Sequence, residues 1–231
     1  ANALDAKNEG TITATISSND MATLNTLTLN TDTNGDPVAH AYTVTVTDNI
    51  VDADKLNILD SKTSVDLVVD NATTLTGTLA GVKKAYASSD AGGGANTIKA
   101  ASFGNEAVTI SDTEIVAADL IAVDAATTGT ISFTGAITKV TGTAANIATL
   151  IASGDIPVFE TASTEIVITG ASALAADIVS INTATTGLIT LDPAVTTIKG
   201  TLTALTAIKN AATTTTDPAF TRTIEGPLSA K

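Results

Sequence analysis

Hydrophobic residues recur along this chain at the three- and four-residue spacing of an amphipathic α-helix, in short stretches. After Thr143, a favourable N-cap, Ile147, Leu150 and Ile151 follow at this spacing. Each stretch covers only two or three turns, so an isolated helix would be marginal in water and must be held by its neighbours. The same spacing predicts helices at Leu202, Leu205 and Ile208 after Thr201; Leu79, Val82 and Tyr86 after Thr78; Leu174, Ile178 and Ile181; Leu120 and Val123; Leu56 and Leu59; and Leu24 and Leu27.

Between the predicted helices, hydrophobic and polar residues alternate, which is typical of β-strands with one buried face. One alternating run follows each helix and turn, and a second, shorter run often closes the segment. Turn residues separate the two strands, and a glycine commonly ends the segment. The predicted first strands cover 42–47, 65–69, 130–133 and 187–191, and the second strands cover 107–111, 137–141, 165–169 and 195–199.

The chain also repeats itself. Ala3-Leu4-Asp5-Ala6 before Gly10-Thr11-Ile12-Thr13 closely matches Ala122-Val123-Asp124-Ala125 before Gly129-Thr130-Ile131-Ser132. Repetition at a period of about thirty residues indicates an array of stacked units. We therefore predict an α/β, β-rich solenoid along 1–231, with about seven units of one short helix and two short strands in parallel-type stacking. The predicted units are 1–17 (partial), 18–48, 49–77, 78–112, 113–142, 143–170, 171–200 and 201–226.

Three arrangements of such units remain open. Neighbouring strands lie about 4.8 Å apart, whereas packed helices need about 8–10 Å. One strand per helix would bend the stack into a horseshoe, and two strands of one sheet per helix would keep it nearly straight. Two strands on separate faces would make a three-sided solenoid.

Composition and charge narrow the function classes. Threonine makes up about a fifth of the residues, aromatic residues are 3%, and the formal net charge is −13. This acidic balance argues against a nucleic-acid partner, and no apolar run is long enough to span a membrane. The absence of cysteine excludes disulfides and thiolate zinc sites. Nothing near the first residues resembles a signal peptide, so secretion would depend on a segment removed or located elsewhere.

Several phrases of the chain carry a family resemblance. They are Leu4-Asp5-Ala6, 125–131, 137–145 and 104–112. These segments are similar to repeats of very large surface or secreted proteins of marine cyanobacteria and other aquatic bacteria. The resemblance implies an extracellular structural or adhesive array and supplies no catalytic motif. The chain departs from many such proteins in lacking glycine-rich calcium nonapeptides.

Candidate sites for chemistry are few. Asp32, Asn34 and Asp36 have the alternating oxygen ligands of a calcium loop but lack the downstream glutamate of an EF-hand, and a turn with Asp and Asn bonded to backbone amides is the other interpretation. His40 is the single histidine, which excludes a multi-histidine metal site within one chain, and we interpret it as a polar residue near the start of a strand. Glu160, Glu165 and Asp155 are close in sequence, but no pattern joins them into an acid–base pair, so we expect no enzyme and no cofactor other than calcium.

Threonines on alternate positions could form a regular hydroxyl surface. Thr11, Thr13 and Thr15 share one strand face, as do Thr43, Thr45 and Thr47. An ice-binding surface needs this pair in successive units, but Leu67, the Ile131–Phe133 pair and Val158 stand at what we take as comparable positions. Ordinary β-propensity and cross-strand pairing explain the threonines without ice binding.

We therefore expect a non-enzymatic extracellular structural repeat protein. Its first residues match the later half of a helix, and we find no polar cap at either end of the array. Open ends predict that the protein binds another copy or flanking repeats, as a filament or as part of a longer surface array. The alternative is a surface adhesin or an ice- or glycan-binding module.

Overall fold

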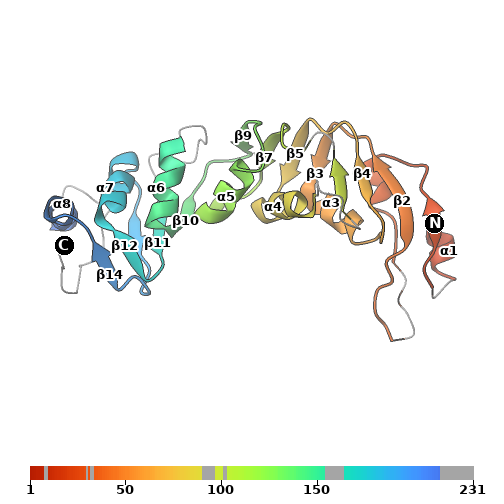
Figure 1. Cartoon of the computed structure of the whole chain (residues 1–231), viewed down its shortest axis with the longest axis horizontal. Coiled ribbons are helices and arrows are strands. Elements are labelled where there is room, and N and C mark those ends of the chain that lie inside the picture. The colour runs from red at the N-terminus through yellow and green to blue at the C-terminus, as the bar shows by residue number, and fades with distance from the viewer. Residues whose placement is uncertain are drawn as a thin grey trace. The chain divides into compact units, whose positions relative to one another are not determined.

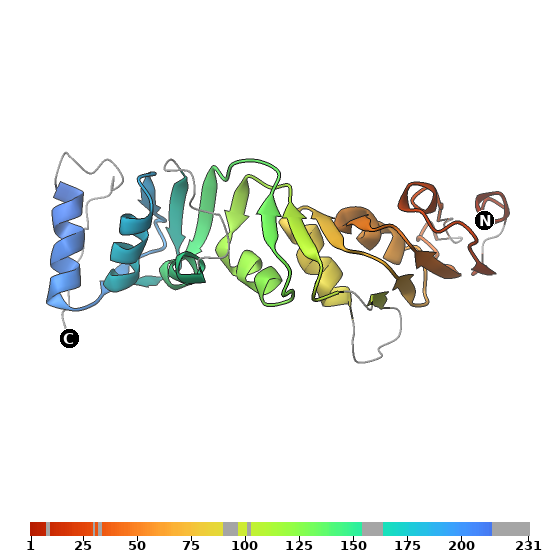
Figure 2. The same cartoon turned by 90° about the horizontal axis from the view of Figure 1, so that it is seen from above.

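The structure is a computed structural model that describes residues 1–7, 10–29, 31, 34–89, 97–100, 103–153 and 164–213. It is a mixed α/β protein with parallel sheets and short helices (Figures 1 and 2). The chain divides into two compact units, the first formed by Ala1–Ser111 with Val123–Ile131 and the second by Asp112–Ala122 with the residues from Ser132 onward.

The first unit contains two four-stranded sheets. One has the order β1 (Thr13–Thr15), β2 (Ala41–Val46), β4 (Leu67–Val69) and β6 (Ile98–Ala100). The other has the order β3 (Ile50–Asp52), β5 (Thr74–Gly77), β7 (Ala107–Ile110) and β9 (Ile131–Phe133), and β9 begins at the last residue of this unit. The helices are α1 (Asn2–Asp5), α2 (Met21–Leu24), α3 (Ala53–Asp60) and α4 (Leu79–Ser88), and α3 lies beside α4 (Figure 1).

The second unit is also built from parallel strands and short helices. One sheet has the order β8 (Glu114–Val116), β10 (Lys139–Thr143), β11 (Glu165–Thr169) and β13 (Ile189–Leu191), and β12 (Ser172–Leu174) pairs with β14 (Thr197–Lys199). Helix α5 (Ala117–Asp124) begins in this unit and ends in the first. Helices α6 (Ala144–Ser153), α7 (Ala175–Ala184) and α8 (Leu202–Thr213) pack in a row, α6 on α7 and α7 on α8 (Figure 2).

The core consists of apolar side chains in register across the parallel strands. Because alternate residues of a strand point to opposite faces, each strand places one set of side chains inward. Every side chain in the following rows is at most 1% exposed: Val44, Leu67 and Ile98; Val51, Leu75 and Val108; and Ile115, Val140, Ile166 and Ile189.

The helices and strands predicted from periodicity are largely present. Thr78, Thr143 and Thr201 act as N-caps, since their hydroxyls accept the backbone N–H three residues on. Helix α2 is only one turn long, shorter than Leu24 and Leu27 suggested. The alternation did not predict the strands just before helices, β3, β5, β8 and β12.

Four buried threonines, each following a helix, join consecutive segments of the chain. Their hydroxyls donate to a backbone carbonyl 21 to 27 residues earlier, at 2.8 to 3.5 Å, and each side chain is at most 9% exposed. Three of these hydroxyls also accept the backbone N–H two residues later. The donor and acceptor pairs are Thr63 with Tyr42, Thr127 with Glu106, Thr164 with Ile137 and Thr185 with Thr164. These bonds satisfy backbone carbonyls and amides that are buried or partly buried between the segments.

A second group of threonines joins consecutive segments by a pair of hydrogen bonds from each residue. Each donates both its backbone N–H and its hydroxyl to one carbonyl, 24 to 28 residues earlier. The pairs are Thr47 with Asn19, Thr73 with Asn49, Thr138 with Thr113, and Thr196 with Ala171. Threonine therefore joins neighbouring segments at two turns. One turn follows the helix, and the other comes before the strand that precedes the next helix.

Glycine lets the chain approach the first residue of a neighbouring helix. A Cβ added to Gly142 would lie 2.8 Å from the Ala117 Cβ, and one added to Gly200 would lie 2.7 Å from the Ala175 Cβ. Both alanines begin helices and are fully buried. At Gly142 and Gly200, close packing between segments therefore requires glycine.

The buried hydroxyl of Thr63 can be tested by Thr63→Val, which keeps the shape of the side chain. The variant leaves the Tyr42 carbonyl and the Val65 amide without their partner, so we expect the free energy of unfolding to fall by about 1–3 kcal/mol in urea titrations. Thr43→Val is the matched control, because Thr43 is exposed on the adjacent strand β2. Equal stability of the two variants would contradict a structural role for the buried hydroxyl.

The close contact at Gly142 can be tested by Gly142→Ala. The added methyl overlaps Ala117, so we expect a loss of about 1–3 kcal/mol in thermal or urea unfolding. Gly135→Ala in the same unit is the control, since its nearest neighbour would be 3.9 Å away. A Gly142→Ala variant as stable as the control would show that the two segments do not pack as described.

Candidate functional site

The sequence-predicted calcium residues lie in a loop that is only partly described. Asp32 falls outside the described residues, while Asn34 and Asp36 are exposed beside Gly35, which has a φ of 87°. Thr31 and Pro37 form an isolated antiparallel bridge across the base of this loop. Among the described residues, no three His, Asp or Glu side chains gather closely enough to hold a metal ion. Calcium binding here stays a prediction.

The other acidic candidates are not brought together in the described structure. Glu165 is half-buried on β11, whereas Asp155 and Glu160 lie outside the described residues, as does the Gly92–Gly94 loop. Glu106 is a buried carboxylate that sequence analysis missed, and it is 3% exposed. It accepts the Tyr86 hydroxyl and the Asn105 amide. The hydrogen bond between Tyr86 and Glu106 links α4 to the loop before β7. Burial, together with the Glu106 carboxylate, raises the pKa of Tyr86.

His40 lies directly before β2, as its position in the sequence suggested, and it is fully buried. It forms a parallel bridge with Thr63 and so holds the place that a buried threonine holds in the next segment. Its Nδ1 accepts the Ile12 amide at 3.1 Å, which puts the ring proton on Nε2, 2.7 Å from Asp5 Oδ1. The other Asp5 oxygen accepts the Thr28 hydroxyl at 2.6 Å.

The Asp5–His40 pair ties α1 to the first sheet. Both imidazole nitrogens are engaged, one by the Asp5 carboxylate and the other by backbone, so neither is directed at a reacting group. Helix α1 is held further by Asn2, whose amide donates to the Thr26 carbonyl and whose oxygen accepts the Thr28 amide. Burial, with the nearby Asp5 carboxylate, raises the pKa of Tyr42 in the same cluster. The geometry is that of a structural cross-link.

Asp60 ends α3 as Asp5 ends α1, but it has no counterpart to His40. Its Oδ1 is buried and has no hydrogen-bond partner among the described residues. Burial raises the pKa of this carboxyl, and the positive charge of Lys84 partly opposes the shift. The fold therefore disfavours the charged form of this carboxyl relative to the unfolded chain.

The threonine rows on the outer face of the first sheet are interrupted. Thr15 lies opposite Thr43, but Thr13 lies opposite Ala41, and Thr45 lies opposite Val68. Leu67, which we took as an outward interruption, is instead fully buried. The regular hydroxyl grid of an ice-binding surface is therefore interrupted at these positions.

Strand β1 forms an edge of the first sheet, and within the described residues it pairs with β2 alone. The Ile12 carbonyl and the Ile16 amide both bond to β2. Because backbone groups alternate along a strand, the N–H and C=O groups of Thr13 and Thr15 point to the opposite side. Both threonines are exposed. This edge offers two donors and two acceptors to another strand.

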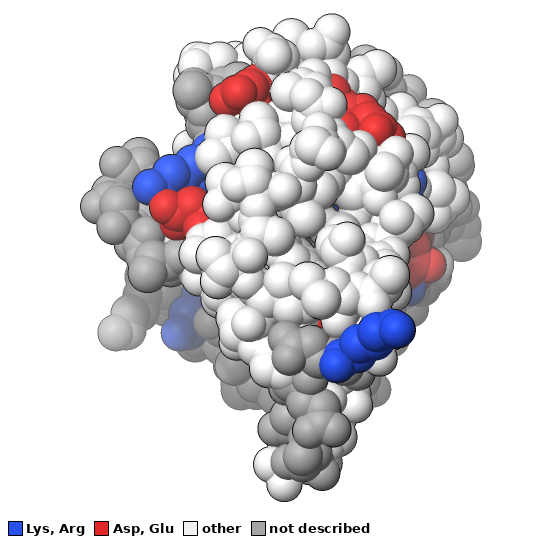
Figure 3. Space-filling view, turned by 90° about the vertical axis from the view of Figure 1, so that its right-hand side faces the viewer, with Lys and Arg blue, Asp and Glu red and all other residues white. Residues whose placement is uncertain are grey.

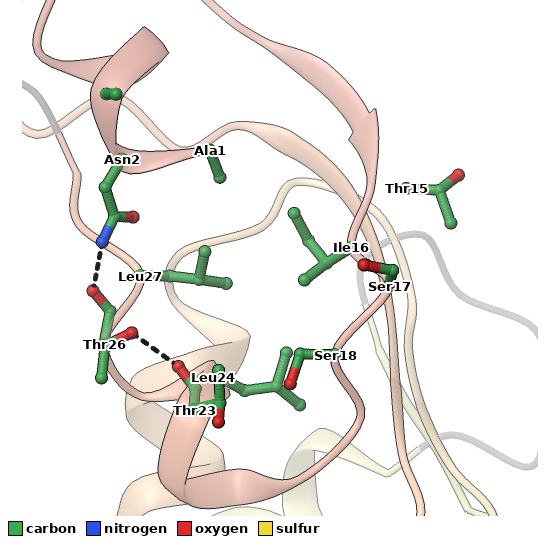
Figure 4. A pocket seen from close by; sticks show the side chains of 11 residues that line it. Ala1, Asn2, Thr15, Ile16, Ser17, Ser18, Thr23, Leu24, Thr26 and Leu27 are labelled. Carbon is green, nitrogen blue, oxygen red and sulfur yellow. Dashed lines mark hydrogen bonds between the residues drawn. The ribbon is translucent and has the colours of Figure 1, made fainter.

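A pocket of about 470 Å³ adjoins this edge, between α1, the end of β1 and α2 (Figure 4). Ile16, Leu24 and Leu27 supply its apolar wall, and Asn2, Ser18 and Thr23 supply uncharged polar groups. Sequence analysis predicted an open end here but did not predict a pocket.

Comparison of the chain with protein-family models, curated proteins and solved structures finds no match. Within the described residues, no helix has both the length and the apolar composition required to cross a membrane.

The raised pKa of Asp60, whose Oδ1 is buried, predicts that stability depends on pH. Its pKa in the folded state is raised, so its contribution to stability is full below the unfolded value of about 3.9 and is lost as the pH rises through the folded value. Asp60→Asn removes the buried charge, so we expect greater stability than wild type at pH 7 and a smaller difference near pH 3. Urea titrations at both pH values measure this difference. Asp70→Asn is the control, because Asp70 is exposed directly after β4. A difference that does not depend on pH would contradict the prediction.

Proposed function

We propose that this chain is a non-enzymatic structural protein of the cell surface or extracellular space. In this proposal, its segments stack as coils of an α/β solenoid, and the chain joins further copies or flanking repeats head to tail, as a filament or a longer array. Three lines of support are the parallel pairing of consecutive segments, the recurring threonine bonds and the similarity to repeats of large surface proteins.

The open edge of β1 is the observation that carries this proposal. Each sheet of the described chain grows by parallel addition of a strand from the next segment along the chain. At β1 the same backbone groups are present, but no strand among the described residues covers them. An exposed edge of this kind is a template for another strand. A second copy that added a strand here would extend the pattern that the chain already uses internally.

Charge is compatible with such an assembly when contacts avoid the acidic surface. The formal net charge of −13 makes two copies repel each other, and salt screens that repulsion. We therefore expect assembly to strengthen as ionic strength rises. The proposal assigns no role to calcium beyond such screening.

Assembly is tested by sedimentation velocity and negative-stain imaging over a range of protein and salt concentrations. We expect open-ended oligomers and fibres whose axial repeat matches one chain. A chain that stays monomeric at every concentration, with and without calcium, would refute the proposal.

The role of the β1 edge is tested by Thr15→Pro. The proline removes an N–H that points away from β2, so pairing with β2 is retained, and proline is tolerated at such edge positions. We expect association to weaken about tenfold or more while the thermal unfolding of the monomer changes little. Unchanged assembly of a folded Thr15→Pro protein would show that this edge is not the contact.

A further inference from the structure

Asn34 and Gly35 form the single Asn–Gly step in the sequence of this chain. Both residues lie in the loop between α2 and β2, and both are exposed. Neither belongs to a helix or a strand, and the bridge between Thr31 and Pro37 joins the chain on either side of them. In Figure 1 the chain just before β2 extends away from the first sheet. The step is therefore open to solvent and apart from the packed core.

Gly35 has the backbone freedom and the space that a reaction with its neighbour needs. Its φ is 87°, in the left-handed region that residues with a side chain seldom adopt. A Cβ added to Gly35 would have no heavy atom within 4 Å, so the backbone here is surrounded by open space. Because glycine has no side chain, its amide nitrogen can approach the Asn34 side chain closely. A nucleophile and a carboxamide carbon thus share one exposed dipeptide.

From these observations we infer that Asn34 is a site of self-modification, where the neighbouring backbone converts the side-chain amide into a carboxylate. The Gly35 nitrogen attacks the Asn34 Cγ, so that an N–C bond forms and the Cγ–Nδ2 bond breaks. Nδ2 leaves as ammonia together with the Gly35 amide proton, and a cyclic imide remains. Water then opens the imide, on one side to aspartate and on the other to isoaspartate. Water is the only co-reactant, and no group is oxidised or reduced.

Two other exposed asparagines lack these conditions and provide a comparison within the same chain. Asn71 precedes Ala72, which is 2% exposed, and Asn105 precedes Glu106, which is 3% exposed. At both places the following residue has a buried side chain, which holds its backbone nitrogen in position. We therefore expect the fold to slow the reaction at these two asparagines but not at Asn34.

The product adds one negative charge to a chain whose formal net charge is already −13. Figure 3 views the part of the first unit that includes α1 and β2, and its described surface is mostly uncharged, with few acidic and basic side chains. One new carboxylate in the loop before β2 is therefore a large change in local charge. Isoaspartate also places the Cβ in the backbone, which lengthens this loop but leaves the paired strands unchanged.

The reaction is tested by incubating the folded full chain at neutral and at mildly alkaline pH. Peptide mass spectrometry locates each change from amide to acid. We expect Asn34 to react about tenfold faster, or more, than Asn71 and Asn105. The rate should rise with pH, because the attacking amide must lose its proton. A parallel incubation in urea should leave the rate at Asn34 nearly unchanged and raise the rates at the other two. Reaction at Asn34 that is no faster than at Asn71 and Asn105 in the folded chain would overturn the inference.

The role of Gly35 is tested by Gly35→Ala, whose added methyl meets no neighbouring atom. We expect it to slow the reaction at Asn34 about tenfold or more, because the methyl hinders the attack, while thermal unfolding changes little. Gly135→Ala, in another exposed turn, is the matched control and should leave the rate unchanged. An unchanged rate in a folded Gly35→Ala protein would contradict attack by this nitrogen. Neither result depends on whether the chain assembles.

Discussion

The hydrogen bond from a threonine hydroxyl to a carbonyl of the preceding segment is the contact on which the rest of this structure depends. Most strands have only three to five residues and most helices two or three turns, so no segment is stable alone. Segments must therefore stabilise one another. In the turns between helices and strands, backbone N–H and C=O groups have no partner within a helix or sheet and need another one. Buried Thr63, Thr127, Thr164 and Thr185 provide those bonds beside the helices. A residue with one hydroxyl and a β-branched shape suits both the corner and the adjoining strand.

The other features follow from the same close stacking. Apolar side chains stand in register because each strand is aligned with its equivalent in the next segment. Gly142 and Gly200 occur where the chain approaches the alanine that begins a neighbouring helix. His40 differs from the buried threonines but makes the same kind of contact between segments. It replaces a threonine at the corner nearest α1, and its longer side chain reaches both the Ile12 amide and the Asp5 carboxylate.

Much of this architecture could be predicted from the sequence, and the reasons for the rest are physical. The periodicity of Ile147, Leu150 and Ile151 predicted α6, because amphipathic helices leave a strong pattern. Strand β5 left no such pattern, because Thr74–Gly77 contains a single buried apolar residue, Leu75. The stability of this strand comes from its pairing with β3 and β7. The division of strands among sheets was also hidden. Strands β5 and β8 both directly precede helices, yet they belong to different sheets, a choice that depends on how strand spacing and helix spacing are reconciled.

The candidate site was predicted less well than the fold. The sequence indicated an open end, but the pocket between α1, β1 and α2 depends on tertiary packing that no local pattern encodes. The buried partner of His40 was also hidden, since Asp5 is 35 residues away and resembles an ordinary residue at a helix end. Only contacts across segments reveal such groups.

Hydrogen exchange tests the central claim, that threonine hydroxyls hold consecutive segments together at their corners. Val65, Gly129 and Gly187 lie outside helices and strands, and each donates its amide to a threonine hydroxyl. We expect these three amides to exchange as slowly as those of the adjacent strands, and much more slowly than the amide of Gly135 in an exposed turn. Exchange of all three at the rate of exposed turns would contradict the account.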